Sequence, residues 1–133
     1  MSDASEIFFT SIGCMDGRAL RPVRKFGKKK FGVWYVDTIT EAGLVGQFAK
    51  ENDPQLLESV KKKLLISLEK HYSKGVIVHG HEDCTGNPVS DDQHKEDILK
   101  SAEIIGRFAP EEIEIVPAFV VKKNGDWEVE VLA

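Results

Sequence analysis

Two short apolar runs that each end in a polar cluster constrain this chain more than any other feature of its sequence. The run that ends at Ile12 precedes Cys14-Met15-Asp16-Gly17-Arg18, and the run Val76-Ile77-Val78 precedes His81-Glu82-Asp83-Cys84. Short β-branched and aromatic runs next to glycine are typical of strands, and all-apolar runs are typical of strands buried on both faces of a parallel sheet. The pattern predicts two buried strands that carry polar residues at their carboxyl ends.

The rest of the chain predicts an α/β fold in one domain over residues 1–133. Asp53-Pro54 is a good helix start, and Asn124-Gly125 is a strong hairpin signal. Gly75 is placed to end the first of two amphipathic helices. The order of elements predicts a mostly parallel central sheet flanked by helices, with an antiparallel C-terminal strand. We expect strands over 6–12, 31–37, 76–78, 112–121 and 126–132, and helices over 53–75 and 91–108.

The segment 18–30 is strongly basic, with seven Lys and Arg residues and no acidic residue. We expect a solvated loop there, and a phosphate or nucleic-acid contact is the alternative. The whole chain has a net formal charge of −4, so nucleic acid is not an expected partner. No leader pattern and no apolar stretch long enough to span a bilayer is visible, which favours a cytoplasmic protein without a membrane partner.

Cys14, His81 and Cys84 form a candidate metal-binding set. Two thiolates and an imidazole can supply three of the four tetrahedral positions of Zn²⁺ and leave the fourth for water or a carboxylate. Ligands of open α/β sheets bind at the carboxyl ends of strands, near the point where strand order reverses, so residues far apart in sequence can meet there. The sequence predicts a zinc site. A Cys14–Cys84 disulfide is the alternative in an oxidising compartment.

Four other polar residues have open assignments. His79 would share a strand face with His81, as a partner of a metal ligand or a competing ligand, or it is a partly exposed residue without a role. We expect His71 and His94 to face solvent on the predicted helices. Asp83 would either hydrogen-bond a metal ligand or lie on the surface.

The two polar clusters resemble the motifs of the β-class carbonic anhydrases, Cys-x-Asp-x-Arg after the first strand and Gly-His-x-x-Cys after a later one. The resemblance implies that Cys14, His81 and Cys84 bind zinc. It also implies that Asp16 and Arg18 form the catalytic pair beside the metal. In that family the Asp either ligates zinc or pairs with the Arg and accepts a hydrogen bond from zinc-bound hydroxide.

The chain also departs from the family pattern. Glu41-Ala42-Gly43 is similar to the family's Asn-Ala-Gly turn but lacks some of its polar groups. Gly17 stands where Ser is usual, and Thr85 replaces a common Gly. The first strand is expected almost at once, so the helical arm that embraces a partner subunit in the family is not expected. A homo-oligomer, most simply a homodimer, remains the expectation from the resemblance.

The implied activity is that of a carbonate dehydratase-like zinc lyase, which hydrates carbon dioxide reversibly to bicarbonate by attack of zinc-bound hydroxide. Two thiolates cancel the formal charge of Zn²⁺ and weaken it as a Lewis acid, so we expect activity to rise toward alkaline pH. One alternative is a hydrolase of carbonyl sulfide or carbon disulfide. Others are a catalytically silent zinc protein with a ligand or partner role, and a regulatory module that binds phosphate or RNA through segment 18–30.

Overall fold

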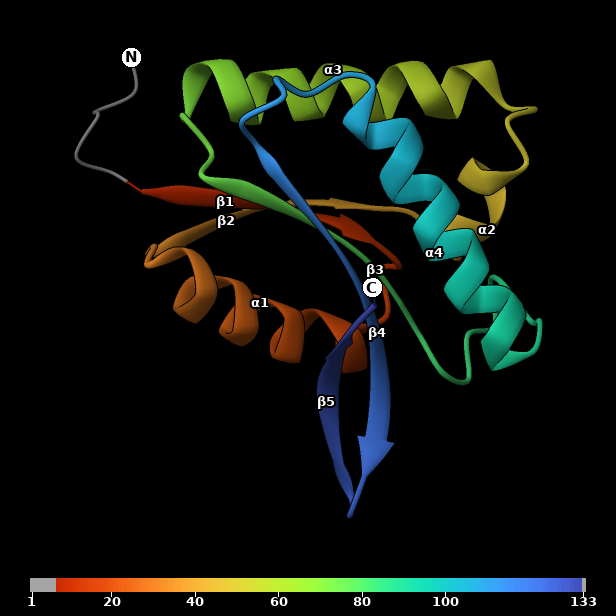
Figure 1. Cartoon of the computed structure of the whole chain (residues 1–133). Helices are drawn as coiled ribbons and strands as arrows, with labels where there is room; N and C mark the ends of the chain where they lie inside the picture. The colour runs from red at the N-terminus through yellow and green to blue at the C-terminus, as the bar shows by residue number, and fades with distance from the viewer. Residues whose placement is uncertain (1–6, 133) are drawn as a thin grey trace.

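A five-stranded sheet forms the centre of the protein in the computed structural model, which describes residues 7–132 (Figure 1). The strand order is β2-β1-β3-β4-β5, and only the β4–β5 pair is antiparallel. The predicted α/β fold with an antiparallel last strand is therefore confirmed. The strands are β1 Phe8–Gly13, β2 Tyr35–Thr40, β3 Gly75–His81, β4 Glu114–Lys123 and β5 Asp126–Val131.

Helices cover both faces of the sheet. α1 (Gly17–Phe31) lies on one face, and α2 (Leu44–Ala49), α3 (Pro54–Lys70) and α4 (Asp91–Gly106) lie on the other (Figure 1). Every residue of β3 is buried, and alternate residues join two separate hydrophobic clusters on the two sides of the sheet. The all-apolar run of the sequence is thus a central strand covered on both faces, as predicted.

Side-chain caps begin two of the helices where the sequence predicts them. The Asp53 carboxylate accepts a hydrogen bond from the backbone N–H of Leu56 at the start of α3, and Ser90 caps α4 in the same way. The prediction that Gly75 ends α3 is wrong, because the helix ends at Lys70. Gly75 instead begins β3, where a side chain would collide with the ring of Phe31.

The predicted basic loop over 18–30 is wrong, because these residues form most of α1. The Asp16 side chain caps the helix by accepting from the backbone N–H of Arg18, and Gly32 ends it in the left-handed conformation with φ of 65°. Pro22 and Gly27 resemble helix breakers in the sequence. Gly27 is required by packing, since a Cβ atom there would collide with the Phe9 ring.

The second strand is also displaced from its predicted position. Because α1 continues to Phe31, β2 starts only at Tyr35 and runs to Thr40. The short helix α2 follows it and was not predicted. The Asn124-Gly125 turn is confirmed: both residues have positive φ, 52° and 80°, as a two-residue hairpin between β4 and β5 requires.

The topology fixes where a ligand can bind. The chain passes from β1 to β2 on one side of β1 and later returns to β3 on its other side, so strand order reverses between β1 and β3. The carboxyl ends of these two strands are therefore the expected binding edge. Within residues 7–132, no helix combines the length and apolarity that crossing a bilayer demands.

Candidate metal centre

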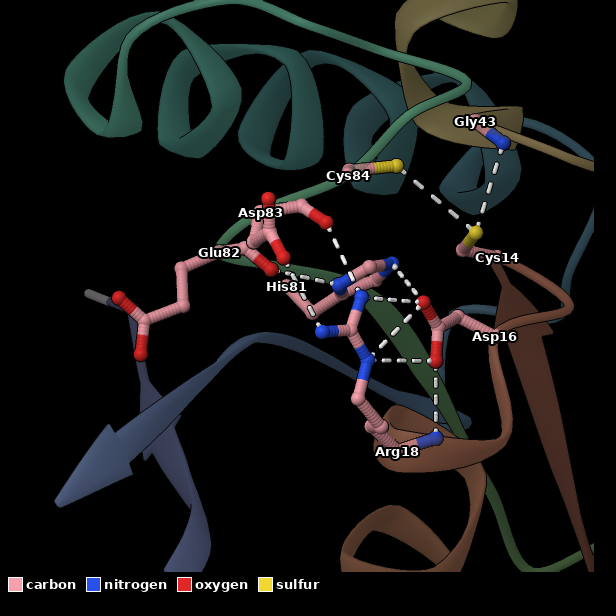
Figure 2. A network of polar contacts seen from close by, with 8 residues as sticks. All are labelled: Cys14, Asp16, Arg18, Gly43, His81, Glu82, Asp83 and Cys84. Atoms are coloured by element: carbon pink, nitrogen blue, oxygen red, sulfur yellow. Dashed lines mark hydrogen bonds and ion pairs between the residues drawn. The ribbon is translucent and has the colours of Figure 1, made fainter. Parts of the chain in front are cut away.

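The two polar clusters of the sequence meet at the carboxyl ends of β1 and β3 (Figure 2). Cys14 follows β1 directly, His81 is the last residue of β3, and Cys84 lies in the loop after it. All three side chains are buried, and their ligand atoms all lie within 4.8 Å of one another. The two Sγ atoms, both of free cysteines, are 3.8 Å apart. The fold thus brings together the three residues that the sequence proposes as metal ligands.

The imidazole of His81 is oriented so that one ring nitrogen faces this cluster. Its Nδ1 donates a hydrogen bond to the Glu82 carbonyl oxygen at 2.7 Å, which leaves the lone pair of the neutral ring on Nε2. Nε2 is buried and has no hydrogen-bond partner among the described residues. A buried polar atom without a partner is costly, and a metal ion held with the two sulfurs would remove that cost. The donor set therefore fits a metal such as zinc.

The two thiols differ in how readily they ionise. Burial raises the pKa of Cys14, but the nearby His81 imidazole and the Gly43 backbone N–H outweigh it and lower the pKa to about 7. Burial and then the nearby Cys14 raise the pKa of Cys84 above its ordinary value. Cys14 is the thiol that is closer to the thiolate form, which a metal requires.

Gly43 contributes a contact to this cluster that the sequence analysis did not predict. Its backbone N–H donates to the Cys14 sulfur at 3.5 Å (Figure 2). Gly43 has φ of 61°, and a Cβ atom there would collide with the backbone of Gly86. Only glycine suits this close approach, so the Glu41-Ala42-Gly43 sequence is the signal that could have located the contact.

Arg18 donates hydrogen bonds to the Asp16 carboxylate, which lies beside the cluster of Cys14, His81 and Cys84. Its Nε donates to Asp16 Oδ1 at 3.0 Å and its terminal nitrogen to Oδ2 at 2.7 Å. These hydrogen bonds outweigh the effect of burial and lower the pKa of Asp16 to about 2. Asp16 Oδ2 lies 3.8 Å from His81 Nε2, so the charged carboxylate borders the candidate site without filling it.

The same guanidinium reaches the second polar cluster. Arg18 donates to the Asp83 carboxylate and to the Asp83 carbonyl oxygen, each at 3.1 Å, and lies 5.0 Å from the centre of the Trp127 ring. Asp83 is therefore a partner of Arg18. Its side chain is 82% exposed, as in the second of the two alternatives, a position on the surface. Arg18 thus joins the loop after β1 to the loop after β3.

The expectations for the other histidines are wrong in part. His79 is fully buried, and its ring fills the space left by Gly13 and contacts the Ser11 hydroxyl at 3.1 Å. Burial lowers the pKa of His79 to about 3. His94 is also buried, against Gly80, and burial lowers its pKa. His71 is only partly exposed.

Comparisons with known proteins bear on the family and the fold of this chain. The model of the family described as "Putative carbonic anhydrase" matches residues 4–133. The fold is similar to that of carbonic anhydrase from Streptococcus mutans, with a TM-score of 0.58 and 17% identity over 90% of this chain and 80% of the other. It is also similar to the β-carbonic anhydrase CafA of Aspergillus fumigatus, with a TM-score of 0.56 and 12% identity over 94% of this chain and 75% of the other.

A search of curated proteins found no match. The family match covers nearly the whole chain, and the two solved structures share its arrangement of strands and helices. The sequence motifs, the fold and the comparisons therefore lead to one assignment. This chain belongs to the carbonic anhydrase-like family of β-class fold.

Proposed function

We propose that this protein is a zinc-dependent carbonic anhydrase that hydrates carbon dioxide reversibly to bicarbonate. The observation that carries the proposal is the buried Nε2 atom of His81, which has no hydrogen-bond partner among the described residues. It lies close enough to two cysteine sulfurs for all three atoms to bind one metal ion. Membership of the family supports the choice of reaction. The proposal makes the protein a lyase whose substrate is a small neutral molecule.

We assign Cys14, His81 and Cys84 as the ligands of Zn²⁺. Two thiolates and one imidazole are a donor set found in catalytic zinc sites, which keep a fourth position open. When bound, the metal would act as a Lewis acid and lower the pKa of a water molecule. The hydrogen bond from His81 Nδ1 to the Glu82 carbonyl would hold the ring in the tautomer that presents Nε2 to the metal.

Asp16 and Arg18 are the proposed catalytic pair. A pKa of about 2 keeps the Asp16 carboxylate charged, and therefore a hydrogen-bond acceptor, throughout the physiological range. We assign Asp16 to accept a hydrogen bond from the attacking water and so to orient it toward carbon dioxide. Arg18 would hold the carboxylate in place through parallel hydrogen bonds, as a positioning residue.

The position of Asp16 supports a second candidate function, that of a zinc protein without hydration activity. Asp16 Oδ2 lies only 3.8 Å from His81 Nε2, so a small movement away from Arg18 would let the carboxylate fill the fourth position. The two oxygens already accept hydrogen bonds from Arg18, and this pairing favours the active form.

The test is a stopped-flow measurement of the rate at which the zinc-loaded protein hydrates carbon dioxide, between about pH 7 and 9. We expect a rate that rises with pH, and a fall of about 100-fold in Asp16→Asn, the size of effect usual for one positioned acid–base group. Asp53→Asn, which alters a helix-capping carboxylate, should keep the activity.

A zinc-loaded protein that is inactive throughout this range would reject the enzyme and favour the silent zinc protein. Turnover of carbonyl sulfide or carbon disulfide without hydration of carbon dioxide would instead change the substrate. A single domain, a homo-oligomer and a cytoplasmic location stay predictions from the sequence. Light scattering by the purified protein measures its oligomeric state.

A further inference from the structure

α1 carries positive charge that the proposed reaction does not use. The helix holds seven basic residues and no acidic residue, on a chain whose net formal charge is −4. Arg18 is engaged by Asp16 and Asp83, and Lys30 pairs with Glu114. The other five, here called the α1 strip, form no ion pair with any residue of the range 7–132. They are Arg21, Arg24, Lys25, Lys28 and Lys29.

The helix gathers the α1 strip on one face. With 3.6 residues per turn, its five positions lie opposite Ala19, Val23 and Gly27, which are buried against the sheet. Four of the five are exposed, and Lys28 is half-buried. A loop would have spread these charges in many directions, whereas the helix holds them in a fixed row directed away from the core.

Grooves lie on both sides of the amino-terminal part of the α1 strip. A groove of about 510 Å³ between α1 and β5 is lined by Arg21 and Lys25 on the helix and by Asp126 and Trp127 on the strand, so its basic wall is the one formed by α1. A second groove, of about 390 Å³, lies between α1 and β2 and is lined by Arg21, Arg24 and Thr38 among others. The β4–β5 hairpin projects beyond α1 on this side of the protein (Figure 1). The basic face is therefore ridged and hollowed rather than flat.

We infer that the α1 strip binds the sugar-phosphate backbone of a single-stranded nucleic acid. This departs from the expectation from net charge, because the helix concentrates positive charge on one face of an otherwise acidic chain. Arginine guanidinium groups match phosphate oxygens through paired hydrogen bonds, and lysines add charge along the same line. The strip lies on a helix of 15 residues, about 22 Å long, and we expect about four phosphate contacts along it. Because contacts to phosphate carry no sequence information, binding should depend little on base sequence.

An anionic membrane is the other polyanion that a basic helix could meet, and three observations favour the nucleic acid. The apolar face of α1 is already buried, so the helix cannot insert it into a bilayer. The surface beside the helix is grooved. The rest of the chain is acidic, and an extended anionic surface would also approach that charge, whereas a strand can follow α1 alone.

The test is fluorescence anisotropy of a labelled 12-nucleotide oligouridine RNA with the zinc-loaded full chain. For about four phosphate contacts, raising salt from 50 to 200 mM should weaken binding about 50-fold. The variant Arg21→Gln/Lys25→Gln/Lys28→Gln should weaken binding at least about tenfold and make the salt dependence shallower. The matched control Lys62→Gln/Lys63→Gln/Lys70→Gln removes the same charge from exposed positions of α3 and should change affinity less than about twofold.

Absence of RNA binding at low salt, or an equal loss in both triple variants, would overturn the inference. Tighter binding to phosphatidylserine vesicles than to RNA, lost in the α1 variant, would overturn it in favour of a membrane. The α1 variant changes no proposed metal ligand or catalytic residue, so its zinc content and carbon dioxide hydration should equal those of the wild type. This readout separates a failure of RNA binding from a failure of the proposed function.

Discussion

Two polar clusters lie near opposite ends of β3, and they differ in how many of their atoms are paired. One is the candidate metal centre of Cys14, His81 and Cys84, here called the metal centre. The other, the Asp37 network, lies near the amino end of the strand. There Asp37 Oδ2 accepts hydrogen bonds from Ser67 Oγ and His71 Nδ1, each at 2.7 Å. The Thr10 hydroxyl lies 2.7 Å from the hydroxyls of both Ser67 and Ser73.

The contrast distinguishes a structural cluster from a binding one. The Asp37 network satisfies its buried hydroxyls with its own members, and Ser73 donates onward to the Gly75 carbonyl oxygen. In the metal centre, His81 Nε2 has no hydrogen-bond partner in the described chain. The two cysteine sulfurs next to it are only weak hydrogen-bond donors and acceptors. Polar groups that satisfy one another stabilise a fold, whereas convergent groups left unpaired indicate a ligand.

The largest expected effect follows from removing one sulfur. Cys84→Ser should reduce bound zinc from about one ion per chain to less than about a tenth, because an alcohol is a far poorer zinc ligand than a thiolate. Metal analysis of the purified protein measures the ratio. Ser67→Ala, in the Asp37 network, is the matched control and should retain zinc. Full zinc content in Cys84→Ser would mean that the metal centre is assigned wrongly.

The next effect is the dependence of zinc affinity on pH. The pKa of Cys84 is raised above its ordinary value and that of Cys14 is about 7, so protons compete with the metal at both sulfurs. From pH 8 to 7 mainly Cys84 must lose a proton, and affinity should fall at least about tenfold. Below pH 7 Cys14 is protonated as well. Burial disfavours the charged form of His81, but the nearby Cys14 and the hydrogen bond to the Glu82 carbonyl outweigh it and raise the pKa, so His81 also binds a proton there. The fall should therefore steepen to at least about 100-fold per unit.

Competition with a coloured chelator between pH 6 and 8 measures this affinity. Zinc affinity that did not change with pH would contradict ligation by the two thiols. Ser67→Ala should show the same pH profile as the wild type, because the Asp37 network has no part in binding the metal.

The convergence of the three candidate metal ligands could be predicted because its signals are local in the sequence. Each motif directly follows an apolar run, and parallel pairing of β1 with β3 brings their ends together. Nothing within a few residues of Cys14 indicates the N–H of Gly43, since that contact depends on how the turn after β2 packs against the Gly86 backbone. The Asp37 network was missed for a similar reason, because its members come from separate elements.

α1 was missed for a different reason. Pro22 and Gly27 disfavour a helix, and the decisive interactions lie elsewhere: Asp16 caps the first turn, and the Phe9 ring fills the space beside Gly27. The burial of His94 likewise depends on the missing side chain of Gly80 on the neighbouring strand. Such long-range complementarity overrides local propensity. The helical pattern was present in α1, because Ala19, Val23 and Gly27 recur four residues apart, but these small residues form a weak apolar stripe among many basic ones.

The Asp37 network makes its own prediction, on stability. Ser67→Ala leaves the Asp37 carboxylate and the Thr10 hydroxyl each short of a partner, and it should lower the free energy of unfolding by about 1–3 kcal/mol. Urea unfolding at a fixed zinc concentration measures the change. A loss below about 0.5 kcal/mol would show that the network is not the closed, self-satisfied cluster that the comparison requires.

The smallest effect is expected at a buried serine that belongs to neither cluster. Ser101 is fully buried and donates one hydrogen bond, to the Val45 carbonyl oxygen at 3.1 Å. Ser101→Ala should cost about 0.5–1.5 kcal/mol in urea unfolding, less than Ser67→Ala, because it breaks one bond and strands no charged group. The two substitutions share no partner, so their costs should add within about 0.5 kcal/mol. If Ser101→Ala and Ser67→Ala lowered the free energy of unfolding by the same amount, a buried hydroxyl in the Asp37 network would stabilise the fold no more than a buried hydroxyl with a single partner.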